Sequence, residues 1–345
     1  MKSFDEILKK GTFIIAEAGV NHNGNLRLAI ELINAAFAAG ADAVKFQTFH
    51  ADKLVTKSAE KAQYQKEATG SSESQYQMLR RLELTYEDHV KLFSYCKNKG
   101  IVFLSTPFDS ESVDLLDELG VGIFKISSGD LTNMPMLQYV AAKGKPVILS
   151  TGMADIKETE EAVLWMRKAG VKHLALLHCT TNYPTPYPEV NLKAMETMKE
   201  AFKIPVGYSD HTVGIEVPLA AAALGACIIE KHFTLDKTME GPDHKASLNP
   251  VELKMMVEGI RNIEKALGNG IKKPTQGELQ NLALARKSIV AGRNIPKGHK
   301  IGMTDLDIKR PFSGIEPKYI YDVIGKVAKR DIQAEENINW SDIEL

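Results

Sequence analysis

Cysteine, net charge and long apolar runs are all scarce in this chain of 345 residues. Its three cysteines, Cys96, Cys179 and Cys227, show no CxxC spacing, so the sequence indicates neither a disulfide framework nor a structural zinc site. Lysine and arginine total 43 against 44 acidic residues, which gives no electrostatic reason to expect nucleic acid or an anionic membrane as a partner. No stretch approaches the roughly 20 apolar residues that span a bilayer, and the charged N-terminus lacks an apolar signal segment, so we expect a soluble cytoplasmic protein.

Eight short apolar and β-branched runs recur along the chain, each followed by a segment with helical periodicity. After the first run, an apolar stripe over 26–39 ends at Gly40, a typical helix stop. A strand and a helix repeated in this way predict an α/β fold of the (β/α)8, or TIM, barrel class. The runs are TFIIAEAG, AVKFQTF, IVFLSTPF, GIFKISSG, PVILSTG, LALLHCT, IPVGYSD and CIIEKHF.

The composition changes after Leu267, where GNGIKKPTQGE indicates a polar linker. From about Ala285, short strands with Gly and Pro turns and no long helix predict a small β-rich domain. We therefore expect a catalytic barrel over 1–270, a linker over 271–284 and a small domain over 285–345. A domain of about 60 residues is marginally stable alone, so we expect it to dock on another surface.

The polar residues of the eight runs gather at the C-terminal end of each run, which is where (β/α)8 barrels carry their active sites. A single serine or threonine there could simply cap the next helix. Polar groups at all eight strand ends instead predict a catalytic site. These residues are Glu17, Lys45, Gln47, Ser105, Thr106, Lys125, Ser128, Asp130, Ser150, His178, Ser209, His211, Lys231 and His232.

A long connection over 50–85, rich in charge, Gln and Ser, separates the second and third predicted strands. Long connections after barrel strands are often lids over the active site. Part of this one, 75–84, could instead be an ordinary helix that packs on the barrel, and the sequence leaves both interpretations open.

His211 and His232 end the seventh and eighth strands, which are neighbours in a barrel. Imidazoles so placed could share a divalent metal and leave positions open for substrate, or each could hydrogen-bond a loop. Lys45 and Lys125 lie in apolar strands, where an unpaired ammonium is costly, so an anionic partner is expected; a Schiff-base lysine is the rival interpretation.

Glu17 and Asp130 are the carboxylates available for proton transfer, although either could form a structural ion pair with a strand lysine. Ser128, Ser150 and Ser209 accompany the lysines. This combination is typical of a cradle for phosphate and carboxylate groups more than of a single nucleophile.

Seven stretches of the chain together resemble the sialic acid synthase family: AEAGVNHNG, STPFD, FKISSGD, ILSTGM, LHCTTNYPTP, GYSDHT and IEKHFTLDKTMEGPDH. The resemblance runs from Phe13 almost to Leu345. In the tail, VAGRNIPKG and DLDIKRPFSGI resemble the family's antifreeze-protein-like (SAF, β-clip) domain. The resemblance implies a metal-dependent condensation of phosphoenolpyruvate with an open-chain N-acetylmannosamine-type sugar, which gives a nonulosonic acid and phosphate.

The resemblance also implies residue roles. His211 and His232 would hold a divalent metal, Mn²⁺ above all, with Mg²⁺ or Co²⁺ as alternatives. Glu17 and Asp130 would move protons, although Asp130 stands where most bacterial members have a longer glutamate. The residues implied to bind substrate are Lys125, Ser128, Ser150 and Ser209 for phosphoenolpyruvate, Lys45, Gln47, Tyr183 and Asp243 for the sugar, and Thr106 without a further assignment.

Arg310 in the tail matches a family arginine that reaches the active site of the other subunit. A domain-swapped homodimer with Arg310 supplied in trans is therefore implied. His22 would orient the first loop after a strand or, as an alternative, bind metal.

The resemblance leans to the N,N'-diacetyllegionaminate synthases, on the stretches VKFQTFHADKLV and STPFDSESVDLLDELG. Phe46 stands where bacterial sialic acid synthases have histidine, and an apolar ring would suit a deoxygenated sugar. An N-acetylneuraminate synthase that uses N-acetylmannosamine, or its 6-phosphate, is the alternative. Another metal-dependent barrel aldolase and a non-catalytic carbohydrate-binding protein are more remote.

Overall fold

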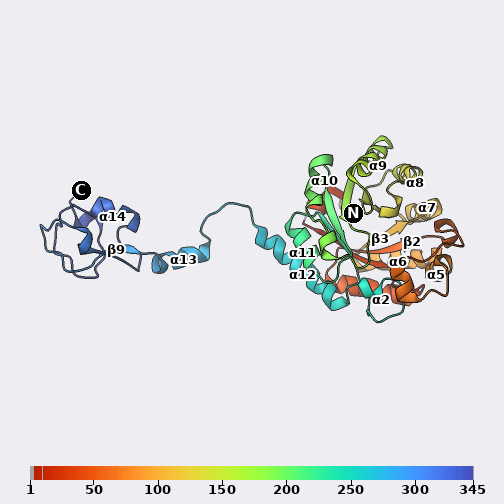
Figure 1. Ribbon diagram of the computed structural model, residues 1–345, viewed down its shortest axis with the longest axis horizontal. Coiled ribbons are helices and arrows are strands. Elements are labelled where there is room, and N and C mark those ends of the chain that lie inside the picture. Colours follow the sequence, from red (N-terminus) through yellow and green to blue (C-terminus); the bar gives the residue numbers. More distant parts are fainter. Residues whose placement is uncertain (1–3, 10, 345) are drawn as a thin grey trace. The chain divides into compact units, whose positions relative to one another are not determined.

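The computed structural model describes residues 4–9 and 11–344. They divide at Gly268 into two compact units. The first contains eight strands with helices around them, and the second is smaller and has short strands (Figure 1). No helix in the described ranges is long and apolar enough to cross a bilayer.

The first unit is a closed parallel barrel, which confirms the predicted fold class. Its strands are hydrogen-bonded in the order β3-β2-β1-β8-β7-β6-β5-β4, all pairs are parallel, and β3 contacts β4 to close the ring. Each strand corresponds to one of the apolar runs. The strands are β1 (Phe13–Gly19), β2 (Ala43–Thr48), β3 (Val102–Pro107), β4 (Phe124–Ile126), β5 (Val147–Ser150), β6 (Leu174–Cys179), β7 (Val206–Asp210) and β8 (Ile228–His232).

The helices lie around the outside of the barrel (Figure 1). The first shows how the sequence sets their ends: Asn25 caps it through the amides of Arg27 and Leu28, and Gly40 ends it with a φ of 83°. The surrounding helices are α2 (Leu26–Ala39), α6 (Tyr86–Lys99), α7 (Ser110–Leu119), α8 (Met134–Ala141), α9 (Ile156–Lys168), α10 (Ala194–Phe202), α11 (Glu216–Ala223) and α12 (Pro250–Leu267). Shorter elements are α1 (Phe4–Lys9), η1 (Ser128–Asp130), η2 (Tyr187–Glu189) and η3 (His244–Ala246).

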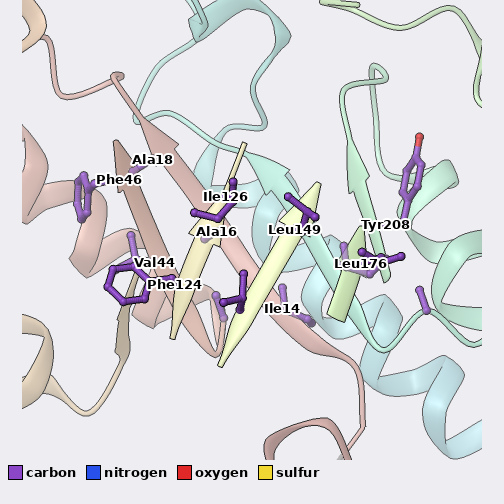
Figure 2. Packing of buried hydrophobic residues seen from close by; sticks show 14 of the residues in the cluster. Ile14, Ala16, Ala18, Val44, Phe46, Phe124, Ile126, Leu149, Leu176 and Tyr208 are labelled. Carbon is purple, nitrogen blue, oxygen red and sulfur yellow. The ribbon is translucent and has the colours of Figure 1, made fainter. Parts of the chain in front are cut away.

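Successive residues of each strand point alternately outward and inward, as in any pleated strand. On the outer face, residues such as Ile14 and Val44 join the main core with the apolar side chains of the helices (Figure 2). On the inner face, residues such as Ile15 and Leu104 form a second core with Phe4 of α1. Apolar side chains therefore fill the amino end of the barrel, and the polar inward side chains lie at its carboxyl end.

The alternation corrects three predicted site residues, because Ser105, His178 and Lys231 face outward. Ser105 Oγ lies 2.6 Å from the hydroxyl of Thr48, and His178 donates from Nε2 to the carbonyl of Val190 at 2.8 Å. Lys231 is fully buried and pairs with Asp210. These polar groups belong to the layer between strands and helices.

Phe46 also faces outward, which makes the argument from its ring to a deoxygenated sugar wrong. It is fully buried in the main core (Figure 2). Its ring stacks on Phe103 at 5.8 Å between centroids and lies 6.0 Å from the ring of His22. A substitution here would act on packing, because no substrate can reach this side chain.

The long connection after β2 folds into α3 (Ala51–Leu54), α4 (Gln63–Thr69) and α5 (Gln75–Leu82). Met78 and Leu82 of α5 pack against Val20 and Phe49, so this part is an ordinary helix on the barrel. α4 behaves differently, because its side chains line the main cavity.

The second unit is built on an antiparallel pair, β9 (Ser288–Ala291) and β10 (Leu306–Lys309). Isolated bridges extend the pairing, and a cluster of isoleucines that includes Ile289 and Ile338 forms its own core. The carboxylate of Asp305 accepts hydrogen bonds from His299 and from the amide of Gly302, each at 2.8 Å. Its remaining elements are α14 (Ile320–Val323), η4 (Met303–Asp305), η5 (Pro317–Tyr319) and η6 (Trp340–Asp342).

The segment predicted as a linker, 271–284, is partly helical, since it contains most of α13 (Gln276–Ala285). The hydroxyl of Thr275 accepts from the amide of Glu278, and the carboxylate of Glu278 accepts from the amide of Thr275. This capping box was readable in the sequence and starts the helix despite the polar composition. No side chain of α13 is buried in this structure.

The buried pair between Lys231 and Asp210 gives a first prediction. Lys231→Met leaves Asp210 buried without its counter-charge, so the free energy of unfolding should fall by about 3–5 kcal/mol. Urea unfolding followed by far-UV circular dichroism measures the change. Lys254→Met is the matched control, because Lys254 and Glu258 form an exposed ion pair that contributes little to the free energy of unfolding. Equal stability of the two variants would contradict the structural role of Lys231.

Candidate active site

A cavity of about 760 Å³ lies at the carboxyl ends of the barrel strands. Inward-facing strand ends and the loops that follow them form most of its wall. The predicted residues that line it are Glu17, Lys45, Gln47, Thr106, Lys125, Ser128, Ser150, Tyr183, Ser209, His211 and His232.

Asp130, Asp243 and Arg310 do not line this cavity. Asp130 is half-buried in η1, where it accepts from Ser127 Oγ at 2.9 Å and from Asn133 Nδ2 at 3.2 Å. Asp243 is buried behind His232, with 3.9 Å between its Oδ2 and the imidazole Nδ1. Arg310 is exposed on the second unit.

A buried group of opposite charges forms the floor of the cavity. Lys45 pairs with Glu17 of the adjacent strand at 2.8 Å and donates to Thr106 Oγ1 at 3.0 Å. Lys125 lies 3.5 Å from Glu230 and donates to Ser150 Oγ at 2.7 Å. All four charged side chains are almost fully buried, so each cation needs its carboxylate in the absence of a substrate.

Glu230 links the two halves of this charged group, and the sequence analysis missed it. Its Oε1 accepts from Ser209 Oγ at 3.0 Å, and its Oε2 lies 3.9 Å from Lys45. The strand period could have found it, since Glu230 precedes the inward-facing His232 by two positions.

The carboxylates in this group differ in acidity. Burial raises the pKa of Glu17 to about 7, because the opposing effect of the Lys45 ammonium does not outweigh it and the negative charge of Glu230 adds to it. Burial also raises the pKa of Glu230, but Lys125 and Lys45 outweigh it, so the net direction is downward. Glu17 can therefore give or take a proton near neutral pH, while Glu230 stays ionised.

The two strand-end histidines face each other, with 5.5 Å between ring centroids. His211 donates from Nδ1 to the carbonyl of Thr180 at 2.7 Å, which leaves the lone pair on Nε2. Nδ1 of His232 is buried and has no hydrogen-bond partner among the described residues. Burial lowers the pKa of both rings, which keeps them neutral. Neutral, converging imidazoles with an unpartnered nitrogen fit a divalent cation.

A second group that could hold a metal lies outside the strand-end histidines. The ligand atoms of His50, Asp109 and Glu111 lie within 4.8 Å of one another. Asp109 is, however, the N-cap of α7 and already accepts from the amide and hydroxyl of Ser112. Glu111 pairs with Lys53. Helix capping accounts for this cluster without a metal.

Cys179 lines the cavity, yet it does not have the character of a nucleophile. Burial raises the pKa of its thiol, and its Sγ lies 3.1 Å from Ser128 Oγ. The same Ser128 oxygen accepts from the amide of Gly152 at 2.9 Å. A Cβ on Gly152 would come within 2.2 Å of Thr181 Oγ1, so the chain is closely packed around Ser128.

A closed (β/α)8 barrel with buried lysines, carboxylates and paired histidines at its strand ends defines a barrel enzyme that works on an anionic substrate. The chain belongs to the NeuB family, whose model matches residues 32–272, and a SAF domain model matches residues 286–344. This confirms the resemblance read from the sequence.

The chain is similar over nearly its full length to two curated relatives. It is 54% identical to an N,N'-diacetyllegionaminic acid synthase of Campylobacter jejuni, over 95% of this chain and 99% of that protein. It is 51% identical to the enzyme of the same name from Legionella pneumophila, over 96% and 94%. Among solved structures, a sialic acid synthetase from Leptospira borgpetersenii superposes with a TM-score of 0.69 at 38% identity, over 79% of this chain and 90% of that one.

The coupling between the two carboxylates gives a second prediction. In metal-free protein, the Glu17 carboxyl should titrate near pH 7, protonated below and ionised above. Glu230→Gln removes a negative charge that favours the protonated form, so the pKa of Glu17 should fall towards its ordinary value. Infrared difference spectra of the protonated carboxyl band against pH measure it, with Glu196→Gln as an exposed control. A Glu17 pKa that is unchanged by Glu230→Gln would contradict the coupling.

Proposed function

We propose that this enzyme condenses phosphoenolpyruvate with open-chain 2,4-diacetamido-2,4,6-trideoxymannose, giving N,N'-diacetyllegionaminate and phosphate. The observation that carries the proposal is the buried group of Lys45, Lys125, Glu17 and Glu230 beside the paired histidines, in a chain about half identical to enzymes named for this product. We place the reaction in the cytoplasm.

Phosphoenolpyruvate binds at the floor of the cavity in this proposal. Lys125, Ser128, Ser150 and Ser209 hold its phosphate and carboxylate. The lysine already donates to Ser150, so the donors converge before the substrate arrives. A trianionic ligand also compensates the desolvation that lowers the pKa of Lys125.

The strand-end histidines hold a divalent metal, Mn²⁺ in our proposal, and the carboxylates of Asp210 and Glu230 both act on His211. When bound, such a cation polarises the aldehyde of the sugar. The tautomer of His211, fixed by Thr180, presents the correct nitrogen for this task.

The carbon–carbon bond forms between C3 of phosphoenolpyruvate and C1 of the sugar aldehyde. Glu17 in its protonated form gives its proton to the aldehyde oxygen as that oxygen becomes a hydroxyl. Water then adds at C2 and returns one proton to Glu17, and phosphate leaves with the other proton by cleavage of the C–O bond, which forms a keto group at C2. The ammonium of Lys45, which also donates to Thr106, balances the negative charge on Glu17 after the transfer.

Lys45, Gln47 and Tyr183 face the sugar in this proposal. Asp130 and Asp243 both lie outside the cavity wall and have orienting roles. The composition of the outer wall, the part of the cavity lining away from the charged floor, favours a neutral sugar with amide groups. Among the described residues that line the cavity, the cations are Lys45 and Lys125 at its floor, and none lies in the outer wall to bind a 6-phosphate.

We further propose a homodimer in which each tail completes the partner's barrel with Arg310. The exposed apolar side chains Met153, Tyr187 and Val213 follow three strand ends around the cavity, and Tyr187 donates its hydroxyl to the carbonyl of Val213 at 3.1 Å. Exposed apolar groups of this kind favour a docking surface for a second chain. The SAF-like unit, exposing Arg310, is the proposed occupant.

Phosphate release tests the reaction. With phosphoenolpyruvate and Mn²⁺, we expect release with 2,4-diacetamido-2,4,6-trideoxymannose well above that with N-acetylmannosamine or its 6-phosphate. EDTA or His211→Ala should abolish it, whereas His178→Ala, an outward-facing strand-end histidine, should retain it. Preference for N-acetylmannosamine would reassign the product to N-acetylneuraminate. If none of the three sugars supports phosphate release, the proposed synthase activity is wrong.

Subunit mixing tests the dimer. His211→Ala and Arg310→Ala proteins should each be inactive, because one lacks a metal ligand and the other a substrate contact. After mild dissociation and mixing, about a quarter of the unmodified activity should return, since random pairing makes half of the dimers mixed, each with one intact site. No recovery in mixtures shown by mass spectrometry to contain mixed dimers would rule out Arg310 in trans.

A further inference from the structure

One wall of the cavity comes from outside the barrel strands and their short loops. α4 contributes Gln63, Tyr64, Gln65 and Glu67 to this wall, and α5 contributes Gln75. These residues carry amides, a phenol and one carboxylate, and no cation is among them. The composition matches a ligand that offers amide groups and apolar carbon to this wall.

Tyr64 is the side chain of α4 that connects with the rest of the site. Its ring stacks on that of Tyr183, with 5.0 Å between centroids and 29° between planes. The ring of Tyr183 lies 4.2 Å from that of His211 and 5.9 Å from that of His232. A continuous series of rings therefore leads from α4 inward to the strand-end histidines.

The segment that carries Tyr64 is held as a folded unit by a buried lysine. Lys61, 3% exposed, donates from Nζ to Thr69 Oγ1 at 2.8 Å, to the carbonyl of Gly70 at 3.0 Å and to Glu73 at 3.0 Å. These bonds tie the start of α4 to its end and to the next loop. A loop this well closed on itself can stay ordered while it covers a ligand.

Gln65 fixes the position of the Tyr64 hydroxyl. Its Nε2 donates to that oxygen at 3.2 Å, and its Oε1 accepts from the amide of Ala62 at 3.0 Å and from Gln75 at 3.4 Å. Burial and the nearby Asp243 raise the pKa of Tyr64, so its phenol keeps its proton. The hydroxyl can therefore donate to an amide carbonyl in the cavity.

We infer that Tyr64 is a specificity-determining residue, which binds the acetamido-bearing end of the sugar farthest from phosphoenolpyruvate. The ring series places it at the outer end of the site, and the surrounding amides of Gln63 and Gln75 suit the same substituent. This inference rests on the proposed function, since it names the part of that sugar which α4 recognises.

Steady-state kinetics of Tyr64→Ala, with each substrate varied in turn, test the inference. The KM for the diacetamido sugar should rise about tenfold or more and the KM for phosphoenolpyruvate should stay within about twofold, because α4 does not reach the floor of the cavity. Discrimination against N-acetylmannosamine should fall as well. Tyr64→Phe should show a smaller change of the same sign, since it keeps the ring.

Tyr76→Ala is the matched control. Tyr76 lies on α5 of the same connection, donates to Asp52 at 2.8 Å and does not line the cavity, so both KM values should stay unchanged. An unchanged sugar KM in Tyr64→Ala, or equal increases for both substrates, would overturn the inference while the synthase stands. If the unmodified enzyme instead releases no phosphate with any sugar, the proposed function and the inference that rests on it both fail.

Discussion

Two lysines and two glutamates buried side by side in the barrel are the constraint on which the rest of the site depends. An ammonium or a carboxylate held away from water is costly, so Lys45, Lys125, Glu17 and Glu230 are stable only as a compensated group. Four different strands contribute one of them each: Glu17 lies beside Lys45 in the register of β1 and β2, and Glu230 pairs with Ile15, two residues before Glu17. The geometry that permits this burial also concentrates reactive groups within one cavity.

Much of the fold and part of the site could be predicted from the sequence, because the strand–helix repeat and the polar strand ends are local signals. Polar strand ends alone do not distinguish the two faces of a strand, because side chains alternate with a period of two. Inward positions are Glu17, Lys45 and His232, whereas Phe46 and Lys231, one residue away from inward positions, face the helices. The same period would have added Glu230.

Other features could not be read from the sequence, because they depend on contacts between distant segments. Tyr64 lies in a polar connection with no strand or helix signal of its own, and its importance arises only from stacking on Tyr183. Asp130 directly follows a predicted strand end, but in the turn of η1 its carboxylate accepts hydrogen bonds from Ser127 and Asn133. Neither orientation follows from local periodicity, since both are set by tertiary packing.

The burial that stabilises the apo site also prepares it for the proposed reaction. Without substrate, Glu17 titrates near neutral pH, because burial raises its pKa to about 7 against the opposing effect of Lys45. A bound phosphoenolpyruvate adds negative charge to the same low-dielectric floor, which raises the pKa of Glu17 further and keeps it protonated. The acid is therefore loaded by the arrival of the first substrate, before the sugar aldehyde needs its proton. The fixed charges of the cavity thus link the binding of phosphoenolpyruvate to the proton transfer from Glu17 to the sugar aldehyde.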